Sequence, residues 1–120
     1  DVAIHAICDA LLGAAALGDI GEHFPDTSAD YAGIDSKILL QRVAALLRQK
    51  GFEISNVDCT VRMQRPKLRP FIGAMCSALA GAMGVDDDRV SVKATTTEHL
   101  GFEGREEGVS VSAVALIYKV

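Results

Sequence analysis

Residues 108–120 read GVSVSAVALIYKV, and this alternation predicts a long β-strand, because successive side chains of a strand point to opposite faces. One face would be apolar along its whole length: Val109, Val111, Ala113, Ala115 and Ile117. The other face begins with serines and continues with Val114, Leu116 and Tyr118. Since both faces are partly apolar, we expect helices to cover one face and a subunit interface to cover the other.

Two more strands are predicted upstream of this one. Residues 52–64 are rich in β-forming side chains, and the segment ends before Pro66. Its apolar side chains alternate for the most part: Ile54, Val57, Cys59, Val61 and Met63. Residues 89–96 are the other β-rich segment.

Three segments carry apolar residues in helical patterns. The first, residues 2–17, is almost continuously apolar, and Gly18 is its expected end. The second begins at Asp35 or Ser36, runs to Gly51, and has a predicted inner face of Ile38, Leu39, Val43, Leu46 and Leu47. The third is residues 67–83, followed by Gly84, with a predicted inner face of Phe71, Ile72, Met75, Leu79, Ala82 and Met83. Residues 18–33 are predicted to form a long but ordered connection.

The order of these elements predicts the fold class. Helix, loop, helix, strand, helix, strand, strand favours an α/β (α+β) fold, with a mixed β-sheet, β-α-β units and helices packed on one face. The other face of the sheet would be buried in an oligomer. The 120 residues, 49% of them hydrophobic, suit a single domain over residues 1–120.

Composition excludes several classes of protein. A net charge of -4 argues against a nucleic-acid partner. No apolar run reaches the roughly 18 residues that span a bilayer, so we expect no membrane segment. The cysteines number 3 and lack Cys-x-x-Cys spacing, which favours a reducing compartment over disulfides. The chain opens at Asp1 within a helical pattern, so we expect residues to be missing before it.

Residues 93–105, KATTTEHLGFEGR, combine groups that suit phosphate chemistry. Threonine hydroxyls donate to phosphate oxygens, Glu98 could hold a hard cation, and the glycines allow close approach of the backbone. Arg62, Arg65, Lys67 and Arg69 form a local basic cluster that could attract a small phosphorylated ligand. The segment 93–105 could equally be a solvated connection, and for the basic cluster the residues alone favour a solvated loop and helix start.

The first helix carries one polar stripe, formed by Asp1, His5 and Asp9 at helical spacing. A core histidine hydrogen-bonded to a carboxylate would explain the stripe, and so would a metal ligand oriented by that carboxylate. Of these, the residues favour the core histidine, since zinc requires at least three protein ligands. His23 and His99 are expected to face solvent.

Several motifs together resemble one known family. They are residues 1–6 (DVAIHA), 9–21 (DALLGAAALGDIG), 24–26 (FPD), 56–58 (NVD), 64–68 (QRPKL), 93–98 (KATTTE) and 100–105 (LGFEGR). In order and across essentially the whole chain, these motifs are similar to those of the 2-C-methyl-D-erythritol 2,4-cyclodiphosphate synthases.

The resemblance implies a homotrimeric lyase of non-mevalonate isoprenoid precursor biosynthesis. Its substrate would be 4-diphosphocytidyl-2-C-methyl-D-erythritol 2-phosphate. The 2-phosphate would attack the β-phosphorus, closing the cyclodiphosphate ring and releasing CMP. The alternative is a non-catalytic, cytidine-nucleotide-binding trimer of the same fold. The location would be a bacterial cytoplasm or a plastid stroma.

The same resemblance implies roles for individual residues. His5 would bind zinc, Glu98 would bind magnesium or manganese, and Thr96 would stabilise the transition state. The methylerythritol part would contact Asp19, Ile20, Gly21, Phe24, Pro25, Asp26, Thr27 and Ser28. The cytidine pocket would be formed by Met63, Gln64, Arg65, Pro66, Lys67, Leu68 and Arg69. Thr95 and Thr97 would line the site beside Thr96.

The resemblance also implies an arrangement across subunits. The cytidine and zinc parts of each active site would come from neighbouring subunits. Phe102, Arg105 and Glu107 would lie at the mouth of an axial cavity that takes an isoprenoid ligand. The family's Asp-x-His zinc motif and its His-Ser pair do not occur in this sequence, so we expect that the leading strand of the sheet is missing as well.

Overall fold

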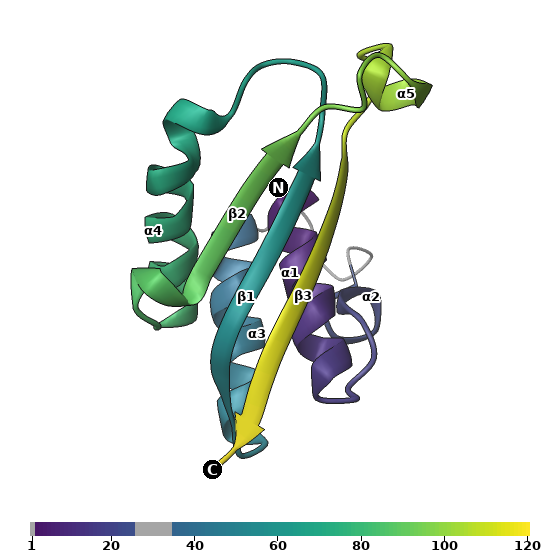
Figure 1. The fold of residues 1–120 in the computed structure, drawn as a ribbon. Coiled ribbons are helices and arrows are strands. Elements are labelled where there is room, and N and C mark those ends of the chain that lie inside the picture. The colour runs from purple at the N-terminus through teal and green to yellow at the C-terminus, as the bar shows by residue number, and fades with distance from the viewer. Residues whose placement is uncertain (1, 26–34) are drawn as a thin grey trace.

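A three-stranded mixed sheet forms the centre of the structure (Figure 1). The computed structural model describes residues 2–25 and 35–120. The strands are β1 (Phe52–Arg62), β2 (Val90–Thr95) and β3 (Ser110–Lys119), in the order β2-β1-β3. β1 runs parallel to β2 and antiparallel to β3. The predicted mixed sheet and its β-α-β unit are therefore confirmed.

One irregularity in β1 explains why its apolar positions alternate imperfectly. The pairing of β1 with β3 shifts register between Ile54 and Asn56. An extra residue at such a bulge restores the inward direction at Val57, three positions after Ile54. Ile54, Val57, Cys59 and Val61 are all buried on the same side of the sheet.

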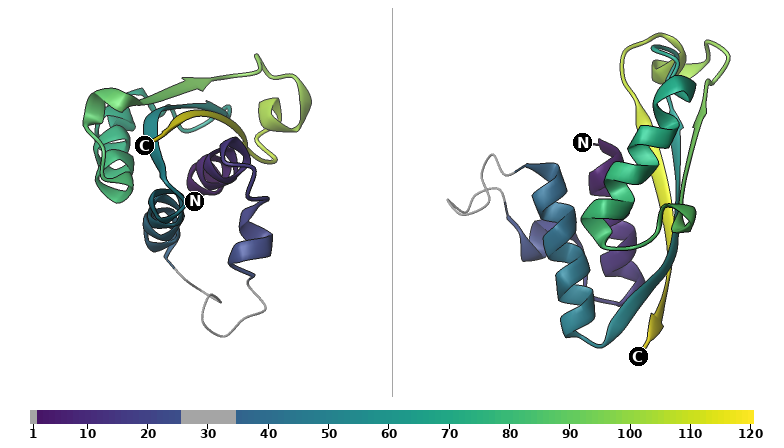
Figure 2. Two further views of the ribbon diagram at one scale, coloured as in Figure 1. Left: turned by 90° about the horizontal axis from the view of Figure 1, so that it is seen from below. Right: turned by 90° about the vertical axis from the view of Figure 1, so that its left-hand side faces the viewer.

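Helices cover this side of the sheet (Figure 2). They are α1 (Val2–Ala14), α3 (Ser36–Gln49) and α4 (Ile72–Met83). The core lies between them and the sheet and includes Leu11, Leu40, Leu47 and Met83, none of which is exposed. Aliphatic side chains at helical spacing thus bury one face of the sheet, as the patterns predicted.

The first helix ends earlier than predicted. Ala16 takes a left-handed conformation, with φ of 57°. The Ala16 N–H donates to Gly13 O at 3.0 Å, and the Leu17 N–H donates to Leu12 O at 2.9 Å. This pair of bonds is a Schellman cap, in which an alanine occupies the position that glycine usually takes. The prediction that Gly18 stops the helix was wrong for that reason.

Other boundaries and faces differ from the predictions in detail. The segment expected to be irregular contains a short helix, α2 (Ile20–His23). The predicted helix at 67–83 begins only at Ile72, because a 3₁₀ turn at Arg69–Phe71 contains the proline and leaves Phe71 57% exposed. On α3 the inner face is rotated, so that Leu40 and Ala44 are buried while Ile38 is 42% exposed. The remaining short elements are η2 (Asp87–Arg89) and α5 (Gly101–Gly104).

The opposite face of the sheet is open in the single chain, and Figure 1 looks onto it. Along β3 this face exposes Val114, Leu116 and Tyr118, at 70%, 61% and 46%. Among the described residues, no helix is long and apolar enough to cross a membrane.

Candidate functional site

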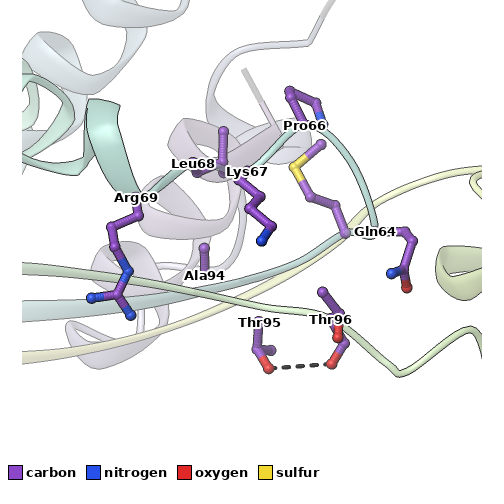
Figure 3. A pocket seen from close by; sticks show the side chains of 9 residues that line it. Gln64, Pro66, Lys67, Leu68, Arg69, Ala94, Thr95 and Thr96 are labelled. Atoms are coloured by element: carbon purple, nitrogen blue, oxygen red, sulfur yellow. Dashed lines mark hydrogen bonds between the residues drawn. The ribbon is translucent and has the colours of Figure 1, made fainter.

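A pocket of about 330 Å³ lies where the parallel strands β1 and β2 both end (Figure 3). It is lined by Met63, Gln64, Pro66, Lys67, Leu68, Arg69, Ala94, Thr95 and Thr96. Two segments about thirty residues apart in sequence are brought together because the carboxyl ends of parallel strands meet at one edge of a sheet. Most of the predicted cytidine segment and two of the predicted threonines therefore share one cavity.

Backbone hydrogen bonding joins the two strand ends that line the pocket. The Met63 N–H donates to Thr95 O at 3.1 Å, which extends the β1–β2 pairing by one bond. The chain then turns through a cis Arg65–Pro66 peptide bond, and Leu68 packs against the core before α4 begins. Arg65 does not line the pocket; its Nε lies 3.2 Å from Glu106 Oε1.

The polar groups of the lining suit an anionic ligand. Lys67 and Arg69 are exposed, and neither has an ion-pair partner among the described residues. The Thr96 hydroxyl oxygen accepts from the Glu98 N–H at 3.3 Å, which leaves the hydroxyl proton of Thr96 to donate elsewhere. Thr95 donates its own hydroxyl proton to Thr96 O at 3.2 Å (Figure 3).

Arg62 belongs to a different network from the basic residues of the pocket. It donates to Ser110 Oγ at 3.0 Å and to Ser112 Oγ at 2.6 Å on the open face of the sheet. Ser110 in turn donates to Glu103 Oε2 at 2.8 Å, and this bond is the main cause of the lowered pKa of Glu103. The four basic residues that cluster in the sequence are therefore separated: Lys67 and Arg69 line the pocket, Arg62 binds serines on the open face of the sheet, and Arg65 pairs with Glu106.

A tight turn follows the pocket threonines and carries Glu98. The Leu100 N–H donates to Thr97 O at 3.1 Å, and the two central residues, Glu98 and His99, have φ of 52° and 66°. Positive φ at both central positions is the type I′ pattern, which usually selects glycine or asparagine. Side chains with a Cβ take this conformation at a cost of about 1–2 kcal/mol each. No glycine in the sequence signalled this turn.

The predicted sugar-binding segment lies on α2, away from the pocket lining. The Asp9 carboxylate accepts from the Ile20 N–H at 2.9 Å, and Asp19 caps the helix by accepting from the Glu22 N–H at 2.9 Å. These bonds fix Asp19, Ile20 and Gly21 against α1. Phe24 and Pro25 follow and are half-buried. Asp26, Thr27 and Ser28 lie outside the described residues.

The histidines correct two expectations. His5 is exposed on α1, so the expectation of a core histidine was wrong. His23, expected to face solvent, is half-buried, and its Nε2 lies 2.5 Å from Leu17 O. His99 is exposed, as predicted.

The predicted axial residues lie on and after α5. Phe102 is 45% exposed, and Arg105 Nε lies 2.5 Å from Glu107 Oε1. Ala94 is the pocket-lining residue for which the sequence predicted no role. Ala94 could have been found from its place beside Thr95 at the end of a parallel strand.

The metal-ligating side chains are dispersed. Within residues 2–25 and 35–120, no group of three or more histidine, cysteine, aspartate or glutamate side chains is placed to hold a metal ion together. Glu98 offers one exposed carboxylate on the turn that follows the pocket threonines, and His5 offers one exposed imidazole on α1.

Comparison with known proteins identifies the family. The family model described as "YgbB family" matches residues 1–118. The 2-C-methyl-D-erythritol 2,4-cyclodiphosphate synthase of Thioalkalivibrio sulfidiphilus is 61% identical over 117 residues, which cover 98% of this chain and 73% of that protein. The synthase of Parabacteroides distasonis is 58% identical over 120 residues, which cover 100% and 74%.

Solved structures agree with this assignment. The bifunctional IspDF from Campylobacter jejuni superposes with a TM-score of 0.95 at 45% identity; the match covers 100% of this chain and 32% of that chain. The CDP complex of IspF from Plasmodium falciparum gives a TM-score of 0.87 at 30% identity, covering 99% and 71%. The chain belongs to the YgbB family, whose curated relatives are the 2-C-methyl-D-erythritol 2,4-cyclodiphosphate synthases.

Proposed function

We propose that this chain is a single cyclodiphosphate-synthase domain, residues 1–120. It converts 4-diphosphocytidyl-2-C-methyl-D-erythritol 2-phosphate to 2-C-methyl-D-erythritol 2,4-cyclodiphosphate and releases CMP, which makes it a phosphorus–oxygen lyase. A relative that is 61% identical carries the name of this activity. The location in a bacterial cytoplasm or a plastid stroma stays a prediction.

The pocket at the ends of β1 and β2 is the observation that carries this proposal. It joins the segment from Met63 to Arg69 with Thr95 and Thr96, in a volume of about 330 Å³. Related structures at 30% and 33% identity are described as complexes with CDP. We therefore assign the cytidine and its first phosphate to this pocket, with backbone groups around Pro66 and Lys67 reading the base.

The reaction closes a ring between two phosphates, so charge and position matter more than a protein nucleophile. The cations of Lys67 and Arg69 offset the negative charge of the nucleotide. The Thr96 hydroxyl oxygen accepts from the Glu98 N–H, and the hydroxyl donates its proton to a phosphate oxygen as charge develops there. Thr95 and Thr97 keep the backbone of this strand end in place.

A magnesium or manganese ion fits the residues present. These ions bind proteins through one or two carboxylates and otherwise use water and substrate phosphates. Glu98, exposed beside Thr96, supplies one such carboxylate. When bound there, the ion would neutralise charge on the diphosphate.

The described residues do not provide a complete zinc site. Catalytic zinc takes three protein ligands, and no such group occurs among the described residues. His5 can supply one ligand, and its role as a zinc ligand stays a proposal. No step of the reaction is derived through zinc.

A homotrimer would place both halves of the site together. The open sheet face exposes Val114, Leu116 and Tyr118, which an interface would bury. The candidate sugar-binding residues on α2 do not line the pocket of their own chain. We propose that they face the pocket of a neighbouring subunit, and that Phe102, Arg105 and Glu107 border an axial cavity with an isoprenoid ligand.

Release of CMP tests the proposed activity. The purified protein is incubated with the substrate, zinc and magnesium, and the products are followed by phosphorus NMR and chromatography. We expect equal amounts of CMP and cyclodiphosphate, and a slower rate in Thr96→Val, which keeps the shape of the side chain but loses the hydroxyl. A protein that binds CMP by calorimetry and forms no product would instead be the non-catalytic nucleotide-binding trimer.

A further inference from the structure

Gln64 connects two parts of the site that are far apart in the sequence. Its side-chain Oε1 accepts a hydrogen bond from the His99 N–H at 3.2 Å, across 35 positions of sequence. Gln64 also lines the nucleotide pocket (Figure 3). His99 directly follows Glu98, the carboxylate assigned to the divalent cation. One amide side chain thus links the pocket to the backbone that carries this carboxylate.

The turn that carries Glu98 needs such a restraint. Glu98 and His99 both have positive φ, a conformation that residues with a Cβ disfavour. Within the turn, Thr97 Oγ1 donates to Leu100 O at 2.5 Å, and Thr96 Oγ1 accepts from the Glu98 N–H. Both bonds join residues within 96–100, so neither reaches the other side of the pocket. The bond from Gln64 is the one that fixes the turn relative to the segment from Met63 to Arg69.

Gly104 holds the other side of the same turn. It is buried, and a Cβ built on it would lie 2.1 Å from the carbonyl carbon of His99 and 2.5 Å from its Cα. Its φ is not positive, so space rather than conformation requires glycine at this position. The His99 backbone is therefore held between the Gln64 amide and the Gly104 backbone.

We propose that Gln64 is a positioning residue that sets Glu98 relative to the nucleotide. It acts through the His99 N–H, so that the nucleotide-binding segment and the cation-binding carboxylate keep one fixed separation. This inference rests on the proposed function, which supplies the nucleotide and the cation. In this role Gln64 acts on the turn that carries Glu98, and it does not need to contact the base itself.

The test compares Gln64→Met, which removes the acceptor, with Gln64→Glu, which keeps an oxygen at the same reach. Hydrogen exchange of the His99 amide reports the bond directly. Loss of one hydrogen bond should speed this exchange about three- to tenfold in Gln64→Met, and Gln64→Glu should restore much of the protection. Unchanged exchange in Gln64→Met would overturn the proposal.

Cation binding supplies a second readout that needs no turnover. With CDP present, the manganese concentration for half-saturation, followed by paramagnetic resonance, should rise about three- to tenfold in Gln64→Met. Affinity for CMP without a divalent cation should change less than this. A large loss of CMP affinity with unchanged manganese binding would show that Gln64 contacts the nucleotide directly, and would overturn the positioning role.

Gly104→Ala provides an independent approach from the other side of the turn. The added Cβ should displace His99 and weaken manganese binding to a similar degree, although Gly104 does not line the pocket. Gly81→Ala is the matched control, since nothing lies within 4 Å of a Cβ at that position. If the unmodified protein binds no CMP, the proposed function fails, whereas the exchange measurement still decides whether Gln64 holds the turn.

Discussion

Replacing Leu116 by aspartate should dissociate the proposed trimer. Leu116 lies on the open face of β3 and is 61% exposed in the single chain. Its neighbours on that face, Val114 and Tyr118, are exposed to a similar extent. In a trimer that buries this face, the substitution would remove an apolar contact and bury a carboxylate in its place.

The exposure of Leu116 gives the size of the effect. Full burial of a leucine side chain is worth about 1.5–3 kcal/mol, so the 61% still exposed corresponds to roughly 1–2 kcal/mol per subunit. Over the subunits of a closed trimer this sums to roughly 3–6 kcal/mol, before the further cost of desolvating the carboxylate. Since about 1.4 kcal/mol is a factor of ten, association should weaken by roughly two to four orders of magnitude.

Sedimentation velocity at micromolar concentration measures this change. Ile38→Asp is the matched control, because Ile38 is 42% exposed on α3, outside the sheet, and an acidic side chain suits the first turn of a helix. The control should sediment as the unmodified protein does. A stable trimer of Leu116→Asp with full activity would refute the assignment of this face to the subunit interface.

Three further predictions concern the site and the ionisable groups. Glu98→Gln should keep the fold, as judged by circular dichroism, and should raise the magnesium concentration needed for half-maximal rate; an unchanged requirement would remove Glu98 from the cation site. The hydrogen bond from Lys93 lowers the pKa of Asp58, so the pair stabilises the protein above the unfolded-state pKa of about 4, and this contribution disappears as the pH falls. Both side chains are more than a third exposed, so Asp58→Asn should cost less than about 1 kcal/mol in urea unfolding at pH 7, and progressively less as the pH falls below about 4. Burial raises the pKa of Cys8 to about 12, so a thiol reagent at pH 8 should label the half-buried Cys76 before it, and unfolding should become easier as the pH rises from about 9 to about 12, because only the unfolded Cys8 thiol ionises there. Labelling of Cys8 ahead of Cys76 would contradict this burial.

The fold followed from the sequence where apolar periodicity decides which face is buried. The alternation along residues 108–120 predicted that helices cover one face of β3, and they do. The other face was predicted to be covered by a subunit interface; in the single chain it is exposed. The amphipathic pattern of α3 predicted the helix but placed Ile38 inside, because a pattern with apolar residues at neighbouring positions leaves the exact direction of the face open. Tertiary packing against α1, α4 and β1 settles that direction.

The ends of helices and the positions of turns were harder to predict, because they depend on backbone conformations that residue type indicates only weakly. An alanine at φ of 57° ends α1, and Glu98 and His99 form a turn that usually contains glycine or asparagine. Neither case has a sequence signature, since the surrounding hydrogen bonds impose the conformation. Most residues that line the pocket were predicted from the sequence. The hydrogen bond between Gln64 and His99 was not, because no sequence pattern indicates a contact between residues 35 positions apart.

The open face of the sheet is divided along its length. Near the pocket end, Arg62 is bound by Ser110 and Ser112, whereas the far half of β3 presents Leu116 and Tyr118. A partner that slid by a few residues along β3 would lay its apolar side chains over the arginine and its hydroxyl partners. Such a displacement would bury the charge of Arg62 beneath side chains that offer it no hydrogen-bond acceptor. In the proposed trimer, this division would fix the register of association, because a copy docked out of register would cover Arg62 and its two serine partners with apolar side chains.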